Sequence, residues 1–264
     1  MLELFLEESL INIVGIIDAD PQAPALADAR NLGIPGFTDL GEAIDACLPC
    51  IAFNLTGDDS INEYAESRLG RDNFIGGFQA HFIWRVLTRL KQKNDQVTHL
   101  AHHDTLTELP NRVLFYDRLG RAISRARRNQ ELLAVLFLDL AGFKPINDTL
   151  GHDAGDELLR LAAKRIVACV RDSDTVARMG GDEFTVILCD LRTSDSIHSV
   201  TEKIIEALAS PFLLHGKERS ISASIGVALY PEHGDTPEQL VKIADAAMYL
   251  AKRGGKNRCH FVAK

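Results

Sequence analysis

The amino-acid sequence has no hydrophobic run long enough to cross a membrane. Its longest apolar run, from Leu10 to Ile17, is interrupted by Asn12, and the chain does not open with the basic, apolar and small-residue order of a signal peptide. An excess of positive charge is missing as well. The net charge is −8, so no broad cationic face is available for a nucleic-acid polymer, whereas a local cluster of Lys and Arg could still bind a free nucleotide. We therefore expect a cytoplasmic protein whose partners include neither a membrane nor a nucleic-acid polymer.

The cysteines do not form the pattern of a disulfide framework. There are five, an odd number, and they are scattered along the chain, which favours reduced thiols. Cys47 and Cys50 have the spacing of a redox motif, but they precede a strand-like run, and no thioredoxin-like or metal-binding pattern surrounds them. Reduced structural thiols are the favoured interpretation of this pair, and a redox role stays open as the alternative.

What the sequence does contain is enough hydrophobic material for two domains. The chain has 264 residues, of which 46% are hydrophobic and 25% are charged, as in soluble globular proteins. We divide it into an N-terminal domain (1–78), a helical linker (79–103) and a C-terminal domain (104–264).

The N-terminal domain alternates strand-like runs with helical patterns, which indicates a small parallel α/β sheet. Strands are expected at residues 12–18, 34–38 and 50–55, and helices at 24–32 and 40–46. The run around Asp18 and Asp20 resembles the second strand and following helix of a Rossmann-type dinucleotide-binding domain, where an acid holds the ribose. No G-x-G-x-x-G precedes it, so the resemblance implies a truncated Rossmann-like regulatory or sensor domain. Dinucleotide binding by these acids is the less favoured alternative to a role as helix caps.

The linker has a single helical pattern. Apolar residues recur at steps of three and four around one polar position: Ile83, Leu87, Leu90, Asn94, Val97 and Ala101. This seam fits either a helix packed on its own domain or a short coiled coil between two copies of the chain. In the coiled coil, Asn94 would fix the register of the two helices.

The most distinctive stretch spans residues 176–188. Two β-prone runs flank Gly180 and Gly181, which indicates a hairpin whose turn needs positive φ and leaves bare backbone open to a large ligand. Asp182 and Glu183 follow directly, so two carboxylates stand at the turn. A plain polar hairpin loop would explain the turn equally well if this motif stood alone.

The motif does not stand alone. The five letters Gly-Gly-Asp-Glu-Phe are the signature of the GGDEF family, the diguanylate cyclases, and the chain from about Asp104 to Lys264 resembles that family. Further family motifs recur in order, namely D-x-L-T-x-L-P-N-R at 104–112, D-[IL]-D-x-F-K-x-I-N-D-x-x-G-H-x-x-G-D at 139–156, and a helical signature at 244–252. One departure is Ala141, which stands where the family usually has a second acid. Because that position is not among the family's principal metal ligands, we expect activity to persist.

The resemblance implies the condensation of two GTP molecules into cyclic di-GMP with release of pyrophosphate. Attack on an α-phosphate needs charge neutralisation, and the implied metal is Mg²⁺, with Mn²⁺ as a possible substitute. The implied metal ligands are Asp139, the backbone carbonyl of Leu140, Asp182 and Glu183. Asp182 and Glu183 are also the implied catalytic residues, with Asp182 as the proton acceptor.

The resemblance also assigns a substrate site. Asn147 and Asp156 would hydrogen-bond the guanine edge, and an acid that accepts from the guanine N1 and N2 donors rejects adenine. The other implied contacts are Lys144, Lys252 and Lys256 for the phosphates, Gly180 and Gly181 at the turn, and His152 in support of the base pocket. Taken singly, each lysine could equally be a solvated surface residue.

Just before the hairpin, Arg171 and Asp174 match the R-x-x-D inhibitory site of the family. An Arg fork can bind a phosphate or a guanine edge. An ordinary surface ion pair is the alternative for these two residues.

The order β-α-β-β-α-β expected for the C-terminal domain is that of a ferredoxin-like palm. Because one such domain holds one GTP, the resemblance implies a homodimer, regulated by the N-terminal domain and by bound product. Two alternative functions remain: an inactive cyclic di-GMP receptor, and an N-terminal dinucleotide-sensing module as the main function.

Overall fold

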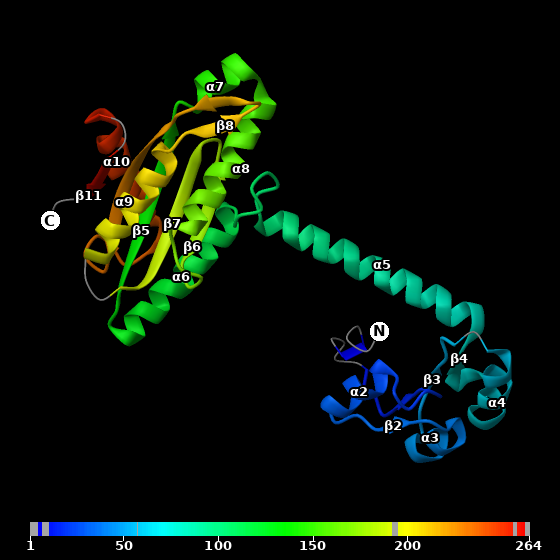
Figure 1. Cartoon of the computed structure of the whole chain (residues 1–264). Helices are drawn as coiled ribbons and strands as arrows, with labels where there is room; N and C mark the ends of the chain where they lie inside the picture. The colour runs from blue at the N-terminus through cyan, green and yellow to red at the C-terminus, as the bar shows by residue number, and fades with distance from the viewer. Residues whose placement is uncertain (1–4, 7–10, 57, 192–194, 256–257, 262–264) are drawn as a thin grey trace. The chain divides into compact units, whose positions relative to one another are not determined.

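The computed structural model describes residues 5–6, 11–56, 58–191, 195–255 and 258–261. The chain divides into two compact units, Met1–Gln96 and Val97–Lys264, and each is described by itself. Helix α5 (Gly77–His102) contributes residues to both units (Figure 1). None of the helices in the described ranges is both long enough and apolar enough to span a bilayer.

The first unit alternates strands and helices, as the sequence pattern predicts. Its elements are β1 (Ile16–Ile17), α2 (Pro24–Asn31), β2 (Gly36–Phe37), α3 (Leu40–Cys47), β3 (Ala52–Phe53), α4 (Asp59–Leu69), the 3-10 turn η1 (Arg71–Asn73) and β4 (Phe74–Ile75). β1 pairs with β2 and β3 with β4, both in parallel. The predicted single sheet is therefore present as two separate parallel pairs among the described residues. Pro35 and the turn at Asp18 flank the first pair, which limits its ladder to two residues on each strand.

The two acids of the Rossmann-like run serve the turn that leads into α2. Asp18 Oδ1 accepts a hydrogen bond from the backbone N–H of Asp20 at 3.0 Å, and Asp20 Oδ1 accepts one from Gln22 at 2.9 Å. This use of the carboxylates favours a local turn-forming role over ribose binding.

The thiols of the first unit form no disulfide. Cys47 and Cys50 are both free, and burial, followed by the neighbouring Cys47, raises the pKa of Cys50. A raised pKa disfavours the reactive thiolate, so nothing in the electrostatics of Cys50 supports a redox role.

The second unit is built on a five-stranded sheet of order β11-β10-β5-β7-β6. Its elements are α6 (Arg112–Asn129), β5 (Leu132–Ala141), α7 (Phe143–Leu150), α8 (His152–Ala168), β6 (Thr175–Gly180), β7 (Glu183–Leu191), α9 (Asp195–Ala209), β8 (Phe212–Leu214), β9 (Lys217–Arg219), β10 (Ser222–Tyr230), α10 (Pro237–Arg253) and β11 (Arg258–Phe261). β5 is antiparallel to both β7 and β10. The run β5-α8-β6-β7-α9-β10 confirms the predicted ferredoxin-like palm, to which α7, the β8–β9 hairpin and β11 are added.

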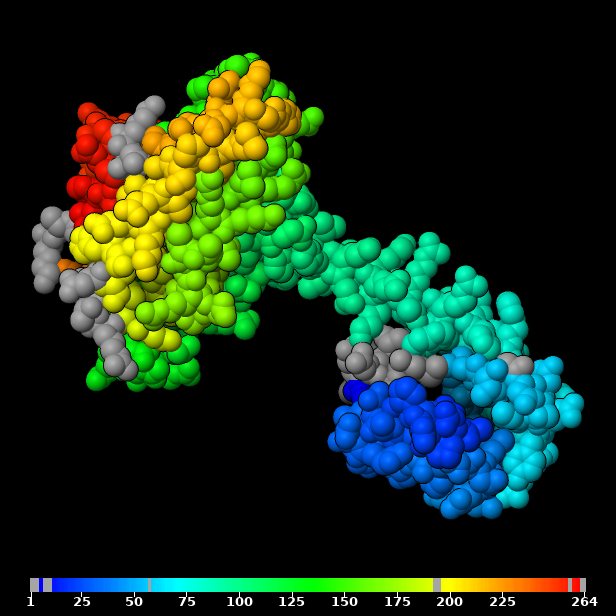
Figure 2. Space-filling view, viewed as in Figure 1, coloured from blue at the N-terminus to red at the C-terminus, as the bar shows by residue number. Residues whose placement is uncertain are grey.

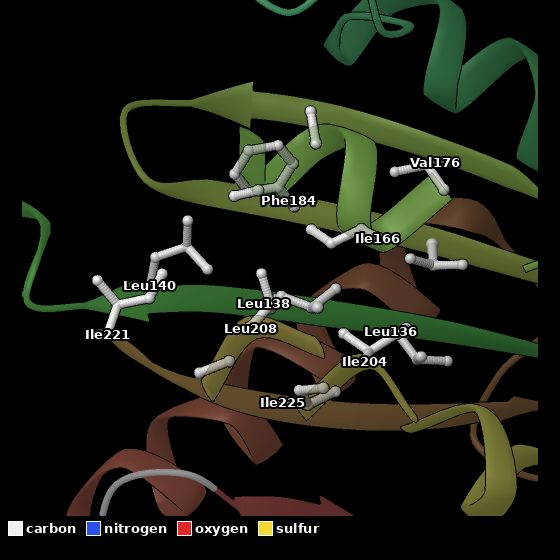
Figure 3. Close-up of a cluster of buried hydrophobic side chains, with 14 of the residues drawn as sticks. Leu136, Leu138, Leu140, Ile166, Val176, Phe184, Ile204, Leu208, Ile221 and Ile225 are labelled. Atoms are coloured by element: carbon white, nitrogen blue, oxygen red, sulfur yellow. The ribbon is translucent and has the colours of Figure 1, made fainter. Parts of the chain in front are cut away.

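Strand β5 is buried on both faces because helices cover both sides of the sheet. Leu136, Leu138 and Leu140 point to the side where α8 and α9 contribute Ile166 and Ile204 (Figure 3). The alternate residues of β5 pack against α6 and α10 on the other side. In the space-filling view, α9 (yellow) lies across the first of these faces (Figure 2). Double coverage explains why the strand reads as one continuous apolar run until Asp139.

Helix α10 approaches β10 very closely at Gly226. A Cβ at this position would lie 2.0 Å from the carbonyl oxygen of Ala244 and 2.1 Å from the backbone nitrogen of Met248. Thr236 caps the helix by accepting a hydrogen bond from Gln239 at 3.3 Å. These two features fix where the C-terminal half of α10, which carries Lys252, lies on the sheet.

Candidate active site

The Gly180–Gly181 turn joins β6 to β7 and leaves its backbone open. Gly180 and Gly181 have φ values of 139° and 55°, and a Cβ on either residue would meet nothing within 4 Å. The backbone N–H of Leu140 donates to the carbonyl of Asp182 at 3.2 Å, which ties the turn to the end of β5. The positive φ values predicted for the glycines are therefore present, at a place where a large ligand can approach.

The sheet register brings two of the predicted acids side by side. Asp139 on β5 pairs with Glu183 on β7, so both side chains project on the α6 and α10 face. Asp139 is only 7% exposed. Burial, then the charges of Asp245, Asp182 and Asp139, raises the pKa of Glu183. These carboxylates thus form a cluster of negative charge in which Asp139 is buried and Asp182 and Glu183 are half-buried.

Lys252 lies against this cluster. Its Nζ is 2.9 Å from both carboxylate oxygens of Asp139. The contact with Oδ2 is a hydrogen bond, whereas the contact with Oδ1 is an ion pair only. Oδ1 is therefore a buried oxygen that lacks a hydrogen bond. The hydrogen bond to Asp139 raises the pKa of Lys252. Lys252 therefore balances the charge of Asp139.

Asp245 was not anticipated from the sequence. It lies on α10, seven residues before Lys252, and its charge is the strongest of those that raise the pKa of Glu183. A spacing of seven residues returns to the same face of a helix, which is the sequence signal that could have indicated it. Asp245 adds a further carboxylate to the edge of the cluster.

The acids fit a magnesium ion that is shared with a substrate. Within the described parts of the chain, no three His, Cys, Asp or Glu side chains are arranged to hold a metal by themselves. Mg²⁺ needs fewer protein ligands, because it keeps several waters and completes its shell with substrate phosphates. The buried Oδ1 of Asp139, which lacks a hydrogen bond, is an oxygen suited to such an ion.

The predicted base-reading residues lie at the junction of α7 and α8. The carbonyl of Asn147 accepts a hydrogen bond from Gly151 at 2.9 Å, and Gly151 has a φ of 88° at the start of α8. Asp156 is half-buried, whereas His152 and Lys144 are exposed. The structure thus places Asn147 and Asp156 at one corner. Lys256 lies outside the described residues.

An ion pair connects the turn to the start of the domain. Arg178 Nη1 donates to both oxygens of Asp104 at 2.9 and 3.0 Å, and its Nε and Nη2 donate to the carbonyl of Gly181 at 3.0 and 2.8 Å. Burial alone would raise the pKa of Asp104, but hydrogen bonds from Thr107 and Arg178 outweigh it and hold the pKa below its usual value. Sequence reasoning missed this pair, because its members are 74 residues apart.

The predicted inhibitory pair forms a backbone turn instead of a side-chain ion pair. Asp174 accepts hydrogen bonds from the backbone N–H groups of Arg171 and Cys189, each at 3.0 Å. The side chain of Arg171 is exposed. A cavity of about 230 Å³ lies nearby, lined by residues that include Arg118, Arg121, Arg125, Ser173 and Cys189.

Comparison with known proteins identifies the family. The family model described as "Diguanylate cyclase, GGDEF domain" matches residues 101–258. The chain belongs to the GGDEF family. Diguanylate cyclase TpbB of Pseudomonas aeruginosa is 50% identical over 188 residues, which are 71% of this chain and 42% of TpbB. The chain therefore spans less than half the length of this relative.

Solved structures of GGDEF domains match well over half of the chain. A structure of the TpbB GGDEF domain from Pseudomonas aeruginosa has a TM-score of 0.60 at 48% identity and covers 61% of this chain and 95% of its own. The coiled coil and GGDEF domain of DgcB from Caulobacter crescentus, in complex with cyclic di-GMP, has a TM-score of 0.62 at 30% identity. That match covers 69% of this chain and 96% of the DgcB chain.

Proposed function

We propose that this GGDEF protein is a diguanylate cyclase that condenses two GTP molecules into cyclic di-GMP. The observation that carries the proposal is the pairing of Asp139 with Glu183 beside the open Gly180–Gly181 turn, with Lys252 in contact. Neighbouring carboxylates, a nearby cation and bare backbone are what a triphosphate and its metal require.

The chemistry is an in-line displacement at phosphorus. The 3′-hydroxyl oxygen of one GTP forms a bond to the α-phosphorus of the other, the bond from that phosphorus to the bridging oxygen of the β-phosphate breaks, and pyrophosphate leaves. Asp182 accepts the hydroxyl proton, and a second identical step closes the ring. When bound, Mg²⁺ or Mn²⁺ neutralises the triphosphate and eases loss of that proton. The metal ion would be held by Asp139, the Leu140 carbonyl, Asp182 and Glu183.

Recognition of the substrate falls to residues on both sides of the turn. Asn147 and Asp156 select guanine, with His152 in support, and Lys144, Lys252 and Lys256 neutralise the phosphates. Gly180 and Gly181 leave room for the triphosphate. Arg171 and Asp174 form a product-binding site through which cyclic di-GMP inhibits the enzyme.

The proposed working form is a cytoplasmic homodimer, because each domain holds one GTP and two must face each other. Residues 1–78 act as the regulatory domain, 79–103 as the linker and 104–264 as the cyclase. The apolar seam of α5 supports the dimer, since Leu90 and Val97 are 58% and 63% exposed within one chain.

The test is incubation of purified protein with GTP and Mg²⁺, with ATP alone and with a mixture, followed by chromatographic identification of products. We expect cyclic di-GMP from GTP alone, no product from ATP, and loss of product in the presence of a chelator. Asp182→Ala should reduce the rate by at least about a hundredfold, whereas Glu218→Ala, on the exposed face of β9, should leave it unchanged.

Each other result has a definite meaning. A mixed guanine and adenine product would show that Asn147 and Asp156 do not select guanine. Turnover that survives Asp182→Ala would overturn the catalytic assignment. Tight binding of cyclic di-GMP without any product would identify a receptor instead of an enzyme.

A further inference from the structure

Helices α7 and α8 meet so closely at Gly155 that a larger residue would have to displace the side chain of Asn147. A Cβ on Gly155 would lie 1.8 Å from Oδ1 and 2.8 Å from Cγ of Asn147, and 3.1 Å from Cε2 of Phe143. Real Cβ atoms do not approach other atoms to less than 3.0 Å. The space that any other residue would fill with its Cβ is therefore occupied by the side-chain oxygen of Asn147.

The amide of Asn147 is held with one defined end inward. Its Oδ1 is buried and has no hydrogen-bond partner in the described part of the chain, whereas its Nδ2 is not one of the buried side-chain atoms that lack a partner there. The C–H groups of Gly155 are weak donors, which favours oxygen over NH₂ at this contact. The outward end of the side chain is then a hydrogen-bond donor.

A buried polar atom without a hydrogen bond lowers stability unless the arrangement serves another purpose. Asp156 follows Gly155 directly in the chain. Its half-buried carboxylate makes no side-chain hydrogen bond or ion pair within the described ranges. An outward donor at Asn147 and an acceptor at Asp156 complement a guanine edge, which carries an acceptor beside the N1 and N2 donors. Adenine lacks this arrangement.

We propose that Gly155 is a positioning residue for base selection, which seats the Asn147 oxygen against its backbone so that the amide donor faces the nucleotide beside Asp156. The inference rests on the proposed function. Gly155 touches no substrate itself, and its effect passes entirely through Asn147. The competing explanation is that Gly155 only allows α7 and α8 to pack.

A double-mutant cycle separates these explanations. The variants are Gly155→Ala, Asn147→Ala and the two combined, and the readout is calorimetric binding of α,β-methylene GTP and α,β-methylene ATP to the full chain. We expect Gly155→Ala to weaken binding of the GTP analogue by at least about tenfold and to leave binding of the ATP analogue unchanged. In the Asn147→Ala background, Gly155→Ala should change neither affinity, because the amide that it displaces is gone.

Controls address folding and the effect of an added methyl group. Gly120→Ala is the matched variant, since Gly120 is also helical and a Cβ there meets nothing within 4 Å; it should bind as the wild type does. If Gly155→Ala lowers the melting temperature, the combined variant should melt at the same temperature as Asn147→Ala alone.

Three results would overturn the inference: wild-type affinity in Gly155→Ala, equal losses with and without Asn147, or equal weakening of both analogues. Failure of the proposed function looks different, because the wild type itself would then bind the GTP analogue no better than the ATP analogue. In that case, the inference falls together with the function that it rests on.

Discussion

At the scale of single residues, Glu183 combines a proposed role as a metal ligand with an unfavourable charge. Burial and the acids around it raise the pKa of Glu183. A carboxyl whose pKa is higher in the folded state destabilises the fold above that pKa, and the effect disappears below the unfolded value of about 4.3. We therefore predict that Glu183→Gln raises the melting temperature at pH 7 by about 2 °C, a modest gain because solvent screens this half-buried group.

The pH dependence of this gain in melting temperature tests its electrostatic cause. The gain should vanish when melting is measured below about pH 4, where Glu183 is protonated in both states. Glu218→Gln, an exposed acid on β9, should leave the melting temperature unchanged at either pH. A lower melting temperature for Glu183→Gln at pH 7 would contradict the prediction.

Arg178 shows how one side chain can hold two segments together. Its side chain is 11% exposed, and its guanidinium bridges Asp104 to the carbonyl of Gly181. Removal of one partner leaves the other charge poorly solvated, so we predict that Arg178→Ala lowers the free energy of unfolding by about 2–3 kcal/mol. Turnover should fall as well, because the backbone before Asp182 loses its fixed partner. Chemical denaturation and product formation measure the two effects.

The matched control is Arg121→Ala, whose ion pair with Asp117 lies on the surface at 3.0 Å. It should change stability by about 0.5 kcal/mol or less. The lowered pKa of Asp104 means that the stabilisation from the Arg178 pair is present above the unfolded pKa of about 3.9 and is lost as pH falls through the folded value. Equal losses for the two arginine variants at pH 7 would contradict a special role for Arg178.

At the scale of elements, the position of α10 depends on the missing side chain of Gly226. The atoms that a Cβ would strike are backbone atoms of Ala244 and Met248, which cannot rotate away. We predict that Gly226→Ala destabilises the domain by about 1–3 kcal/mol and shifts α10, so that Lys252 loses its 2.9 Å contact with Asp139. The melting temperature and the rate of GTP turnover should both fall in Gly226→Ala, whereas Gly120→Ala should alter neither.

The features that could be predicted from the sequence are those set by residues close to one another along the chain. The hairpin at 180–183, the seam of α5 and the palm order could be read from local spacing and period. The link from Lys252 to Asp139 spans 113 residues, and the fit of Gly155 around Asn147 depends on how two helices pack. No local pattern encodes such contacts. The first unit shows the same limit, since its parallel pairing was predictable but its division into two short pairs was not.

At the scale of the whole molecule, the proposed cyclase chemistry would require two copies of the chain. Along the seam predicted for the linker, Ile83, Leu90 and Val97 are exposed on α5, whereas Leu87 is half-buried. Apolar residues at a period of three and four on an exposed helix are typical of a helix that packs on another helix. A second copy of this chain is the occupant that the proposed reaction also demands.

We therefore predict that the combined variant Leu90→Glu and Val97→Glu dissociates the proposed dimer, because it places like charges in the seam. Light scattering should show a fall from dimer to monomer mass, and turnover should drop by at least about tenfold, since it depends on two sites meeting. Binding of α,β-methylene GTP to each chain should be unchanged. Gln92→Glu, which lies on the opposite side of the helix from Leu90, should affect none of these quantities. If the double variant kept full turnover as a monomer, the two active halves could not meet through α5, and the dimer would have to form through the GGDEF domains alone.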